Sequence, residues 1–517
     1  MAFVVAAPAA STLQPGTALN IQNVAGREEG YAVATTPKNL VFIMSDEHSR
    51  RVLGCYGHPM IQTPHLDQLA ASGVRFTDAY CNSPICVPSR ASFATGRYVH
   101  DIRFWDNAIP YDGSVPSWGH RLQQAGNRCT SIGKLHYRST EDRNGFDEEV
   151  MPLHVVDGVG DLLGLIRDDM PVRASSLRLA QQAGAGDSDY QGYDDKITAA
   201  SQDWLRERAK ERGERPWVLF VSLVCPHFPL IARPEFYNLY PEKDVPWPAF
   251  YEESARPDHP FIKAVADCMV YDKAFDAVRV RRAIAAYFGM VTFLDQNIGK
   301  LLATLNETGL VADTRVLYTS DHGDNLGTRG LWGKSTMYEE SAGVPMILAG
   351  ADVPAGFICH EPVSLVDCFP TILDAAGVKP HPADHDLPGH SLLDILRGTG
   401  PRRTILSEYH AAGSATGAFM IRKGPYKYVN YVGMPPQLFD LEADPQESCD
   451  LGTHPGYQGV VADCEVALRR IVDPEAVDRL ARSDQAARIA SFGGRQAIMK
   501  RGTFGHSPVP GTKPSYV

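Results

Sequence analysis

Short apolar segments alternate with helical patterns along most of this chain, and no other feature constrains its fold as strongly. Five segments are short and apolar enough to be buried strands: 40–44, 129–132, 217–223, 316–319 and 344–348. Before the fourth segment, apolar residues recur at helical spacing from Val291 to Leu305, and Gly309 can end that helix. This order predicts an α/β fold with a mostly parallel sheet flanked by helices.

Polar residues follow four of these strands directly. They are Asp46, Glu47 and His48, then Lys134 and His136, then His227, and finally Asp321 and His322. Ligands of doubly wound sheets bind beyond the carboxyl ends of the strands, where these residues meet. Any one of them could instead be a loop residue or a helix cap, and Asp324 is expected to cap the helix that follows it. Because such residues follow four strands and not only one, a functional site is the better interpretation.

The pattern changes near Pro401, where β-rich segments separated by Gly and Pro predict a small antiparallel sheet followed by a helix. We therefore expect four regions: a flexible leader at 1–37, a catalytic α/β domain at 38–400, a smaller α+β domain at 401–484 and a tail at 485–517. The tail carries five basic residues and no acidic one. It could dock on an acidic surface, including that of a neighbouring subunit, or stay solvated, and both readings remain open.

The charge balance and the apolar content exclude several classes of protein. Fifty Lys and Arg stand against 61 Asp and Glu, a net charge of −11 that argues against non-specific nucleic-acid binding. No apolar run is long enough to span a membrane, so we expect no membrane association. The apolar start of the chain lacks a basic region, which argues against a signal peptide and for a cytoplasmic location.

One of the ten cysteines stands in a specific context, Cys86-Val87-Pro88-Ser89-Arg90. Pro88 suits the first turn of a helix, which would put Cys86 at the helix N-terminus, where the backbone N–H groups favour an anion. A thiol so placed beside Arg90 is expected to have a lowered pKa and to be reactive. Most free cysteines are instead small buried core residues.

This motif, with Thr95-Gly96-Arg97 after it, resembles the signature of the sulfatases, a branch of the alkaline phosphatase superfamily whose cysteine is oxidised to formylglycine. Further motifs extend the resemblance over most of the chain: 39–46, 63–67, Gly133-Lys134-Leu135-His136, Ser320-Asp321-His322-Gly323-Asp324, Lys334 and 438–447. Within the family, Asp106-Asn107, 145–148 and Asp321-His322 look most like choline sulfatases and phosphonate monoester hydrolases.

The resemblance implies an alkaline-phosphatase-like fold and one divalent metal ion held by Asp46, modified Cys86, Asp321 and His322. A mostly oxygen donor set with one imidazole suits Mn²⁺ at least as well as Ca²⁺. Glu47 has less support as a ligand, because neighbouring residues of an extended chain point apart.

The resemblance also implies roles for the other polar residues. Hydrated formylglycine at position 86 attacks sulfur through one hydroxyl, and its second hydroxyl later expels sulfate. Arg90 would stabilise the nucleophile, Lys134 would hold the diol, and His136 would be the base. His227 and Lys334 would face the ester oxygen, one of them protonating the departing alcohol. Asn107 would donate to a sulfate oxygen.

These residues predict a hydrolase of small-molecule sulfate monoesters, with the formylglycine-generating enzyme as a partner and a homodimer or homotetramer as its assembly. Two alternatives remain open: a phosphonate monoester or phosphodiester hydrolase on the same site, and a non-catalytic binding relative with Cys86 left as a thiol. The segment 151–191 contains no tryptophan to grip a quaternary ammonium, which argues against choline. The aromatic residues of 237–261 could form a lid, although plain packing is the default.

Overall fold

The computed structural model describes residues 36–517 except 212, 214, 351, 402, 515 and 517. The expected leader at 1–37 lies outside the described residues apart from its last two. The main sheet has eight strands in the order β11 (Phe357–Cys359), β2 (Gly73–Phe76), β10 (Met346–Ala349), β9 (Thr314–Ser320), β1 (Asn39–Asp46), β7 (Val218–Pro226), β4 (Cys129–Lys134) and β5 (Glu148–Leu153).

The centre of this sheet is parallel. Strands β9, β1, β7, β4 and β5 run in one direction, with Ile43 of β1 opposite Val221 on one side and Tyr318 on the other. β1 is buried from Leu40 to Asp46, as expected for a strand covered on both faces. The strand expected at 344–348 begins at Met346 and runs antiparallel to β9. The α/β architecture with a mostly parallel sheet is thus confirmed.

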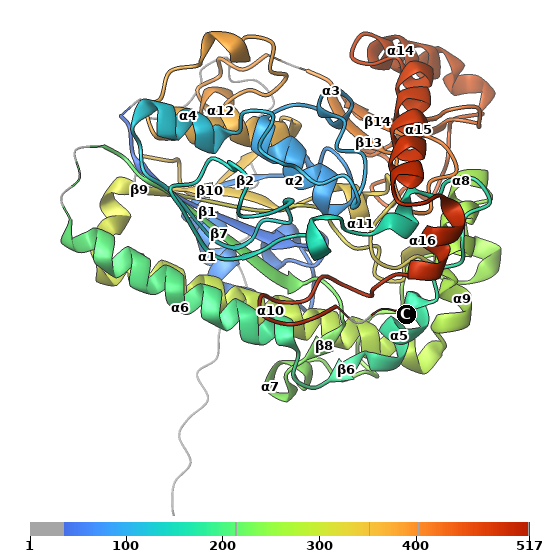
Figure 1. The fold of residues 1–517 in the computed structure, drawn as a ribbon, viewed down its shortest axis with the longest axis horizontal. Coiled ribbons are helices and arrows are strands. Elements are labelled where there is room, and N and C mark those ends of the chain that lie inside the picture. The colour runs from blue at the N-terminus through green and yellow to red at the C-terminus, as the bar shows by residue number, and fades with distance from the viewer. Residues whose placement is uncertain are drawn as a thin grey trace, which may run out of the picture.

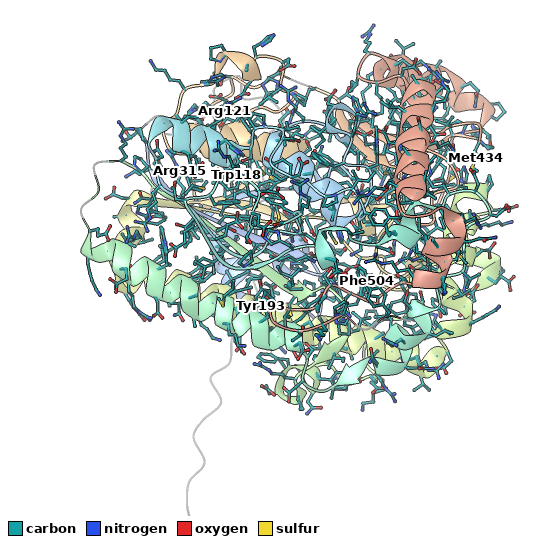
Figure 2. The ribbon with its side chains drawn as sticks, in the orientation of Figure 1. Trp118, Arg121, Tyr193, Arg315, Met434 and Phe504 are labelled. Carbon is teal, nitrogen blue, oxygen red and sulfur yellow. The ribbon has the colours of Figure 1, made fainter. Side chains whose placement is uncertain are left out.

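Helices cover both faces of the sheet (Figure 1). On one face lie α6 (Asp189–Lys210) and α10 (Ala277–Glu307), which contains the helix predicted from Val291 to Leu305. On the other face lie α2 (Cys86–Thr95), α4 (Trp118–Ala125) and α12 (Cys368–Ala375). The buried indole of Trp118, labelled in Figure 2, packs edge-on against the rings of Phe146 and Phe220, which joins α4 to β7.

Smaller elements complete the catalytic part. The other helices are α1 (Pro64–Ala71), α3 (Val99–Ile102), α5 (Ser175–Gln182), α7 (Pro234–Tyr237), α8 (Pro260–Met269), α9 (Tyr271–Ala274), α11 (Glu339–Ala342) and α13 (Leu392–Leu396). Two further sheets each hold two strands: β3 (Ala79–Tyr80) with β12 (Val363–Ser364), and β6 (Gly184–Ala185) with β8 (Ile231–Ala232). Among the described residues, no helix is both long and apolar enough to cross a bilayer.

The C-terminal part contains the antiparallel sheet that the sequence predicts. Its strands are β13 (Ile405–Tyr409), β14 (Ala418–Lys423), β15 (Tyr426–Tyr431) and β16 (Gln437–Asp440), each paired with the next. The predicted helix at 459–471 is α14 (Gln458–Arg469), which contacts β14 and β15. Apolar side chains of this sheet and of α14 form one buried cluster, which also contains Tyr98, Val99 and Trp105 of the catalytic part. The small sheet is therefore packed onto the catalytic part.

The boundary expected at Gln485 falls inside a helix, α15 (Pro474–Ser491), which α16 (Arg495–Arg501) follows. The three arginines of the expected tail, Arg488, Arg495 and Arg501, bind the chain's own surface. Arg495 donates to the backbone carbonyls of Asp168 and Asp169, and Arg501 lies 3.3 Å from the carboxylate of Asp157. This segment therefore docks on an acidic region of the same chain.

Candidate active site

Four strand ends deliver polar side chains to one edge of the sheet, as the sequence predicts. Asp46 is the last residue of β1, Lys134 is the last residue of β4, and Asp321 and His227 directly follow β9 and β7. β1 lies between β7 and β9. The side chains of Asp46 and Asp321 are therefore delivered side by side, and both are fully buried.

Helix α2 brings the cysteine to this edge. Cys86 is its first residue, with Ile85 as N-cap in an extended conformation and Pro88 in the first turn, as predicted. Gly96, at φ 67°, ends the helix in the left-handed conformation that glycine adopts readily. The Cys86 Sγ atom lies 3.2 Å from His322 Nε2 and 3.7 Å from Asp46 Oδ1.

Arg90, one turn further along α2, joins the two buried carboxylates. Its Nε donates to Asp321 Oδ2 at 2.7 Å, and its Nη2 donates to Asp46 Oδ2 at 3.2 Å. Its Nη1 donates to the Lys134 carbonyl and to the Ser222 hydroxyl, both at 2.9 Å. Since every guanidinium nitrogen has a partner in the site, Arg90 is a fixed cation that neutralises the carboxylates and orients them.

Asp46, Cys86, Asp321 and His322 offer donor atoms that all lie within 4.8 Å of one another. The His322 Nδ1 atom lies 3.0 Å from the Gly323 carbonyl, an arrangement in which Nδ1 carries the proton and the lone pair of Nε2 points into the group. Two carboxylate oxygens, one imidazole nitrogen and a fourth donor at position 86 fit a divalent cation. The residues predicted as metal ligands are thus brought together.

Lys134 contributes a second cation. Its Nζ lies 2.5 Å from Asp46 Oδ2, and both groups are fully buried. Burial alone would raise the pKa of Asp46, but the positive charges of Lys134 and Arg90 oppose it, and that pKa is held well below its ordinary value. Asp46 is therefore a carboxylate at neutral pH, as a metal ligand must be.

Lys334 connects the cysteine to His227 and Glu47. Its Nζ lies 3.2 Å from Cys86 Sγ, 3.0 Å from His227 Nε2 and 3.2 Å from Glu47 Oε2. Burial lowers the pKa of Lys334, but Cys86 and Glu47 more than offset it and raise it well above its ordinary value. Glu47 is thus an ion-pair partner of Lys334, and the structure does not place it in the four-residue donor group, although it is near Asp46 and His227.

His227 is held as a neutral imidazole. Its Nδ1 lies 2.7 Å from the Phe228 carbonyl, which leaves Nε2 to accept a hydrogen bond from Lys334. Burial and the positive charge of Lys334 lower the pKa of His227 well below its usual value. Lys334 is therefore the protonated member of this pair.

The thiol of Cys86 differs from expectation. Burial and the negative charge of Asp46 raise its pKa, and Lys334 and Lys134 do not compensate. The expectation of a lowered pKa considered the helix N-terminus and Arg90, but Arg90 is committed to the two carboxylates. The unmodified cysteine is consequently a thiol and not a ready thiolate nucleophile.

Asn107 and Asp324 both bind backbone N–H groups. The side-chain oxygen of Asn107 accepts from Val87 N at 3.1 Å, which leaves its amide nitrogen as the donor end at the pocket. Asp324 was expected to cap a helix, but no helix starts there. Its carboxylate accepts from Leu326 N at 2.6 Å and from Gly333 N at 3.0 Å, so it joins the two ends of a loop.

Cys86 opens into a pocket of about 150 Å³. Its walls contain Lys134, His136, His227 and Lys334 as predicted, and also residues that the sequence analysis missed: Asp161, Arg173, Arg178, Tyr190, Phe228, Tyr271, Phe504, His506 and Ser507. Several of these come from the segment 151–191, where unmatched basic residues were the available signal. None of the 237–261 aromatic residues lines this pocket, and Tyr240 is buried against Thr292, so packing was the correct default.

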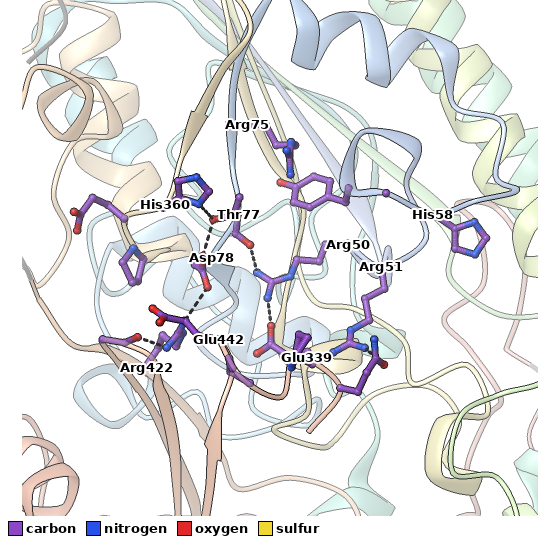
Figure 3. Close-up of a pocket in the computed structure, with 18 of the residues that line it drawn as sticks. Arg50, Arg51, His58, Arg75, Thr77, Asp78, Glu339, His360, Arg422 and Glu442 are labelled. Carbon is purple, nitrogen blue, oxygen red and sulfur yellow. Dashed lines mark hydrogen bonds and ion pairs between the residues drawn. The ribbon is translucent and has the colours of Figure 1, made fainter. Parts of the chain in front are cut away.

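A larger cavity of about 930 Å³ lies elsewhere, and Figure 3 shows it. Most of the arginines that line it are paired with carboxylates: Arg50 with Glu339, Arg422 with Asp78, Arg51 with Glu340 and Arg403 with Asp367. Arg75 lies over the ring of Tyr56. Since most of these charges are already compensated and neither the metal-donor group nor the Lys334 cluster lines the cavity, we assign the chemistry to the pocket at Cys86.

Removing the charge of Arg90 should therefore expose the repulsion between two buried carboxylates. We expect Arg90→Met to lower the free energy of unfolding of the metal-free protein by about 3–5 kcal/mol, measured by urea unfolding. Arg97→Met is the matched control, because Arg97 pairs with Asp386 near the surface and is worth about 1 kcal/mol or less. Equal losses for the two variants would contradict the role assigned to Arg90.

The comparisons with known proteins agree with this geometry. A choline-sulfatase from Rhizobium meliloti (strain 1021) is 32% identical over 470 residues, which cover 88% of this chain and 91% of that protein. Arylsulfatase K from Danio rerio is 30% identical over 473 residues, covering 85% of each. The crystal structure of a phosphonate monoester hydrolase of Agrobacterium radiobacter superposes with a TM-score of 0.66 at 22% identity, over 84% of this chain and 95% of that one, which supports the fold.

Family models match most of the chain. The sulfatase model matches residues 38–378, and a model for the C-terminal part of N-sulphoglucosamine sulphohydrolase matches residues 327–473. The first match contains the cysteine helix and all four strand ends of the site. The chain therefore belongs to the sulfatase family of the alkaline phosphatase superfamily, and it is a sulfuric ester hydrolase.

Proposed function

We propose that this protein hydrolyses sulfate monoesters with a nucleophile made from Cys86 and with one divalent metal ion, releasing inorganic sulfate and an alcohol or a phenol. The observation that supports the proposal most is the position of Cys86. Its sulfur contacts the metal-donor group through His322 and Asp46, and it also contacts Lys334 of the Lys334–His227 pair. Attack on sulfur needs a nucleophile supported by positive charge, and departure of the alcohol needs a proton donor.

The modified residue and the metal would supply what the other side chains lack. Formylglycine at position 86 would supply an oxygen nucleophile, and the cation held by Asp46, Asp321 and His322 would supply positive charge for the sulfate oxygens. The imidazole of His322 favours Mn²⁺ over Ca²⁺, which prefers an all-oxygen shell.

The chain's own cations complete the binding of the anion. Lys134 and Lys334 both line the pocket beside position 86, and the amide nitrogen of Asn107 adds a neutral donor. Because these groups are buried, their hydrogen bonds to a sulfate are stronger than they would be in water. We assign Lys134 to the oxygens at position 86 and Asn107 to a peripheral sulfate oxygen.

The departing alcohol needs a proton, and Lys334 is placed to give it. His227 holds its own proton on Nδ1, against the Phe228 carbonyl, so its Nε2 accepts from Lys334 and has no proton to donate. The Nζ atom of Lys334 lies 3.2 Å from the Glu47 carboxylate, and this neighbour favours the charged form of the lysine. We infer that Lys334 is the acid and that His227 orients it.

The outer part of the pocket disfavours a cationic leaving group. Asp161 is the only carboxylate among its described lining residues, and it is paired with Arg173. Arg178, Lys134 and Lys334 leave the lining with an excess of positive charge. A quaternary ammonium needs an aromatic surface without competing cations. We therefore propose a neutral or anionic organic group on the sulfate, in contrast to choline.

Mass spectrometry of the Cys86 peptide tests the nucleophile. Protein from cells with the modifying enzyme should carry an aldehyde in place of the thiol, and Cys86→Ala should lower kcat by about 10³-fold or more without unfolding the chain. Cys449→Ala is the control, because Cys449 is exposed and far from the pocket residues. An unmodified thiol in an active enzyme would contradict the proposal and favour a different nucleophile; a thiol in an inactive protein would favour a binding role.

Metal titration tests the donor set. After chelation, we expect Mn²⁺ to restore hydrolysis at lower free concentration than Ca²⁺, and His322→Asn to reduce that preference, because it replaces the imidazole by an oxygen donor. Isothermal titration of the metal-free protein gives the same ratio without turnover. Asp324→Asn is the control and should keep the preference for Mn²⁺. An unchanged preference in His322→Asn would contradict the assignment of His322 as a ligand.

A panel of matched esters tests the substrate class. The ratio of kcat/KM should favour an aryl sulfate over the corresponding aryl phosphonate monoester, and a carboxylate-bearing alkyl sulfate over choline sulfate, because the pocket is cationic. A preference for the phosphonate would replace the proposed reaction by phosphonate ester hydrolysis at the same site. A preference for choline sulfate would refute the argument from the excess positive charge of the pocket lining.

A further inference from the structure

The chain's C-terminal segment reaches the pocket at Cys86. After α16 the backbone crosses to the carboxyl edge of the sheet, where Phe504, Gly505, His506 and Ser507 line the same pocket as Cys86 and Lys334. Figure 1 shows this stretch in red, running across the molecule in front of α10, and Figure 2 labels Phe504. We call residues 503–507 the C-terminal strap. Nothing in the sequence motifs assigns it a function.

Ser507 contacts a residue of the proposed reaction directly. Its Oγ lies 2.9 Å from His136 Nε2, and Ser507 is buried, with 7% of its surface exposed. Tyr190 donates from its hydroxyl to the Ser507 carbonyl at 2.6 Å, and its ring meets the His506 ring edge-on at 5.0 Å. Tyr190 also lies against His227, with ring centroids 5.9 Å apart. The strap is therefore in direct contact with His136, and Tyr190 links it to His227.

The hydrogen-bonding of His136 is asymmetric. Nε2 is bonded to Ser507, whereas the buried Nδ1 atom has no partner among the described residues. The backbone of His136 has φ 61°, a strained conformation for a residue other than glycine, and its N–H is fixed by the Leu153 carbonyl at 2.8 Å. A buried ring nitrogen without a partner is costly unless it faces a reacting group. The fold thus keeps an unpaired nitrogen on a residue that lines the pocket, at a cost in stability.

A serine hydroxyl can accept from Nε2–H or donate to Nε2, and the unpartnered Nδ1 favours the first arrangement, because a buried N–H without an acceptor costs more than an unused lone pair. With the proton on Nε2, the lone pair of the neutral imidazole is on Nδ1. Burial and the charge of Lys134 keep His136 neutral, because they lower its pKa well below its usual value. Ser507 therefore orients His136 in the way that the third residue of a hydrolytic triad orients the base.

Other contacts anchor the strap. Thr503 donates to the Asp161 carboxylate at 3.2 Å and accepts from Arg173 at 3.4 Å. Phe504 of the strap pairs with Tyr516 through a β-bridge, and Tyr516 hydrogen-bonds at 3.3 Å to Arg501, which pairs with Asp157 of the catalytic domain. These bonds tie both sides of the segment to the catalytic domain, so Ser507 does not depend on its contact with His136 to stay in place.

We propose that the C-terminal strap is part of the active site, with Ser507 as the positioning residue that fixes the proton of His136 on Nε2 and presents Nδ1 as the base. The proposal rests on the proposed function for its catalytic consequence, but the position of the proton is a property of the folded chain. Lys334, the last of the proposed catalytic residues along the chain, lies 173 positions before Ser507.

The test is the position of the His136 proton in the full-length chain. With ¹⁵N-labelled histidine, and with His136→Gln to assign the signal, the parent protein should show the proton on Nε2, both with Cys86 modified and with Cys86 left as a thiol. Ser507→Ala should divide the proton between both nitrogens. Ser507→Thr keeps the hydroxyl and should behave as the parent does. Thr512→Ala removes an exposed hydroxyl that binds only Val509 and is the control.

Turnover gives the second readout. Ser507→Ala should lower kcat roughly 10- to 100-fold with little change in KM, as when the partner that orients a functional histidine is removed. It should shift the limb of the pH profile assigned to His136, and Ser507→Thr should restore both. Melting temperature and formylglycine content should match the parent, which separates positioning from folding or modification.

The results that overturn the proposal are specific. A proton on Nδ1 in the parent, or an unchanged proton position in Ser507→Ala, refutes the orienting role of Ser507. A loss of kcat that Ser507→Thr does not rescue indicates a packing role only. If the parent hydrolyses no sulfate ester while the Nε2 proton responds to Ser507→Ala, the proposed function fails and the contact stands, so the two failures are distinguishable.

Discussion

Two buried carboxylates lie side by side at the centre of this molecule, and Arg90 is the group that makes their burial possible. Without a cation between them, the two buried carboxylates would repel each other in a region of low dielectric. Arg90 reaches both because it lies one turn after Cys86 on α2. The same guanidinium therefore compensates the two carboxylates and ties the helix that carries the cysteine to them.

The rest of the site follows from strand order. β1 lies between β7 and β9, with β4 beside β7, so their carboxyl ends bring Asp46, Asp321, His227 and Lys134 to one place. Positive and negative groups alternate there. Lys334 contacts Cys86, His227 and Glu47. Burial raises the pKa of Glu47 well above its ordinary value, and the positive charge of Lys334 opposes that shift. An anion that enters this pocket meets cations on several sides, although the chain as a whole is acidic.

Much of this arrangement could be predicted from the sequence, because buried strands are apolar runs and the residues after parallel strands meet at one edge. The antiparallel direction of β10 has no local pattern, and neither has the loop closed by Asp324. The pKa of Cys86 was misjudged because only the packed structure shows that Arg90 is already engaged. The strap was missed for a similar reason: the contact of Ser507 with His136 joins residues 371 positions apart.

Hydrolysis of a simple alkyl sulfate in ¹⁸O-labelled water tests the central claim most directly. A nucleophile at position 86 and a proton from Lys334 to the leaving oxygen both require that the S–O bond breaks. The account predicts that the label appears in the released inorganic sulfate and that the alcohol stays unlabelled. Label in the alcohol would mean that the C–O bond breaks, and it would contradict attack at sulfur.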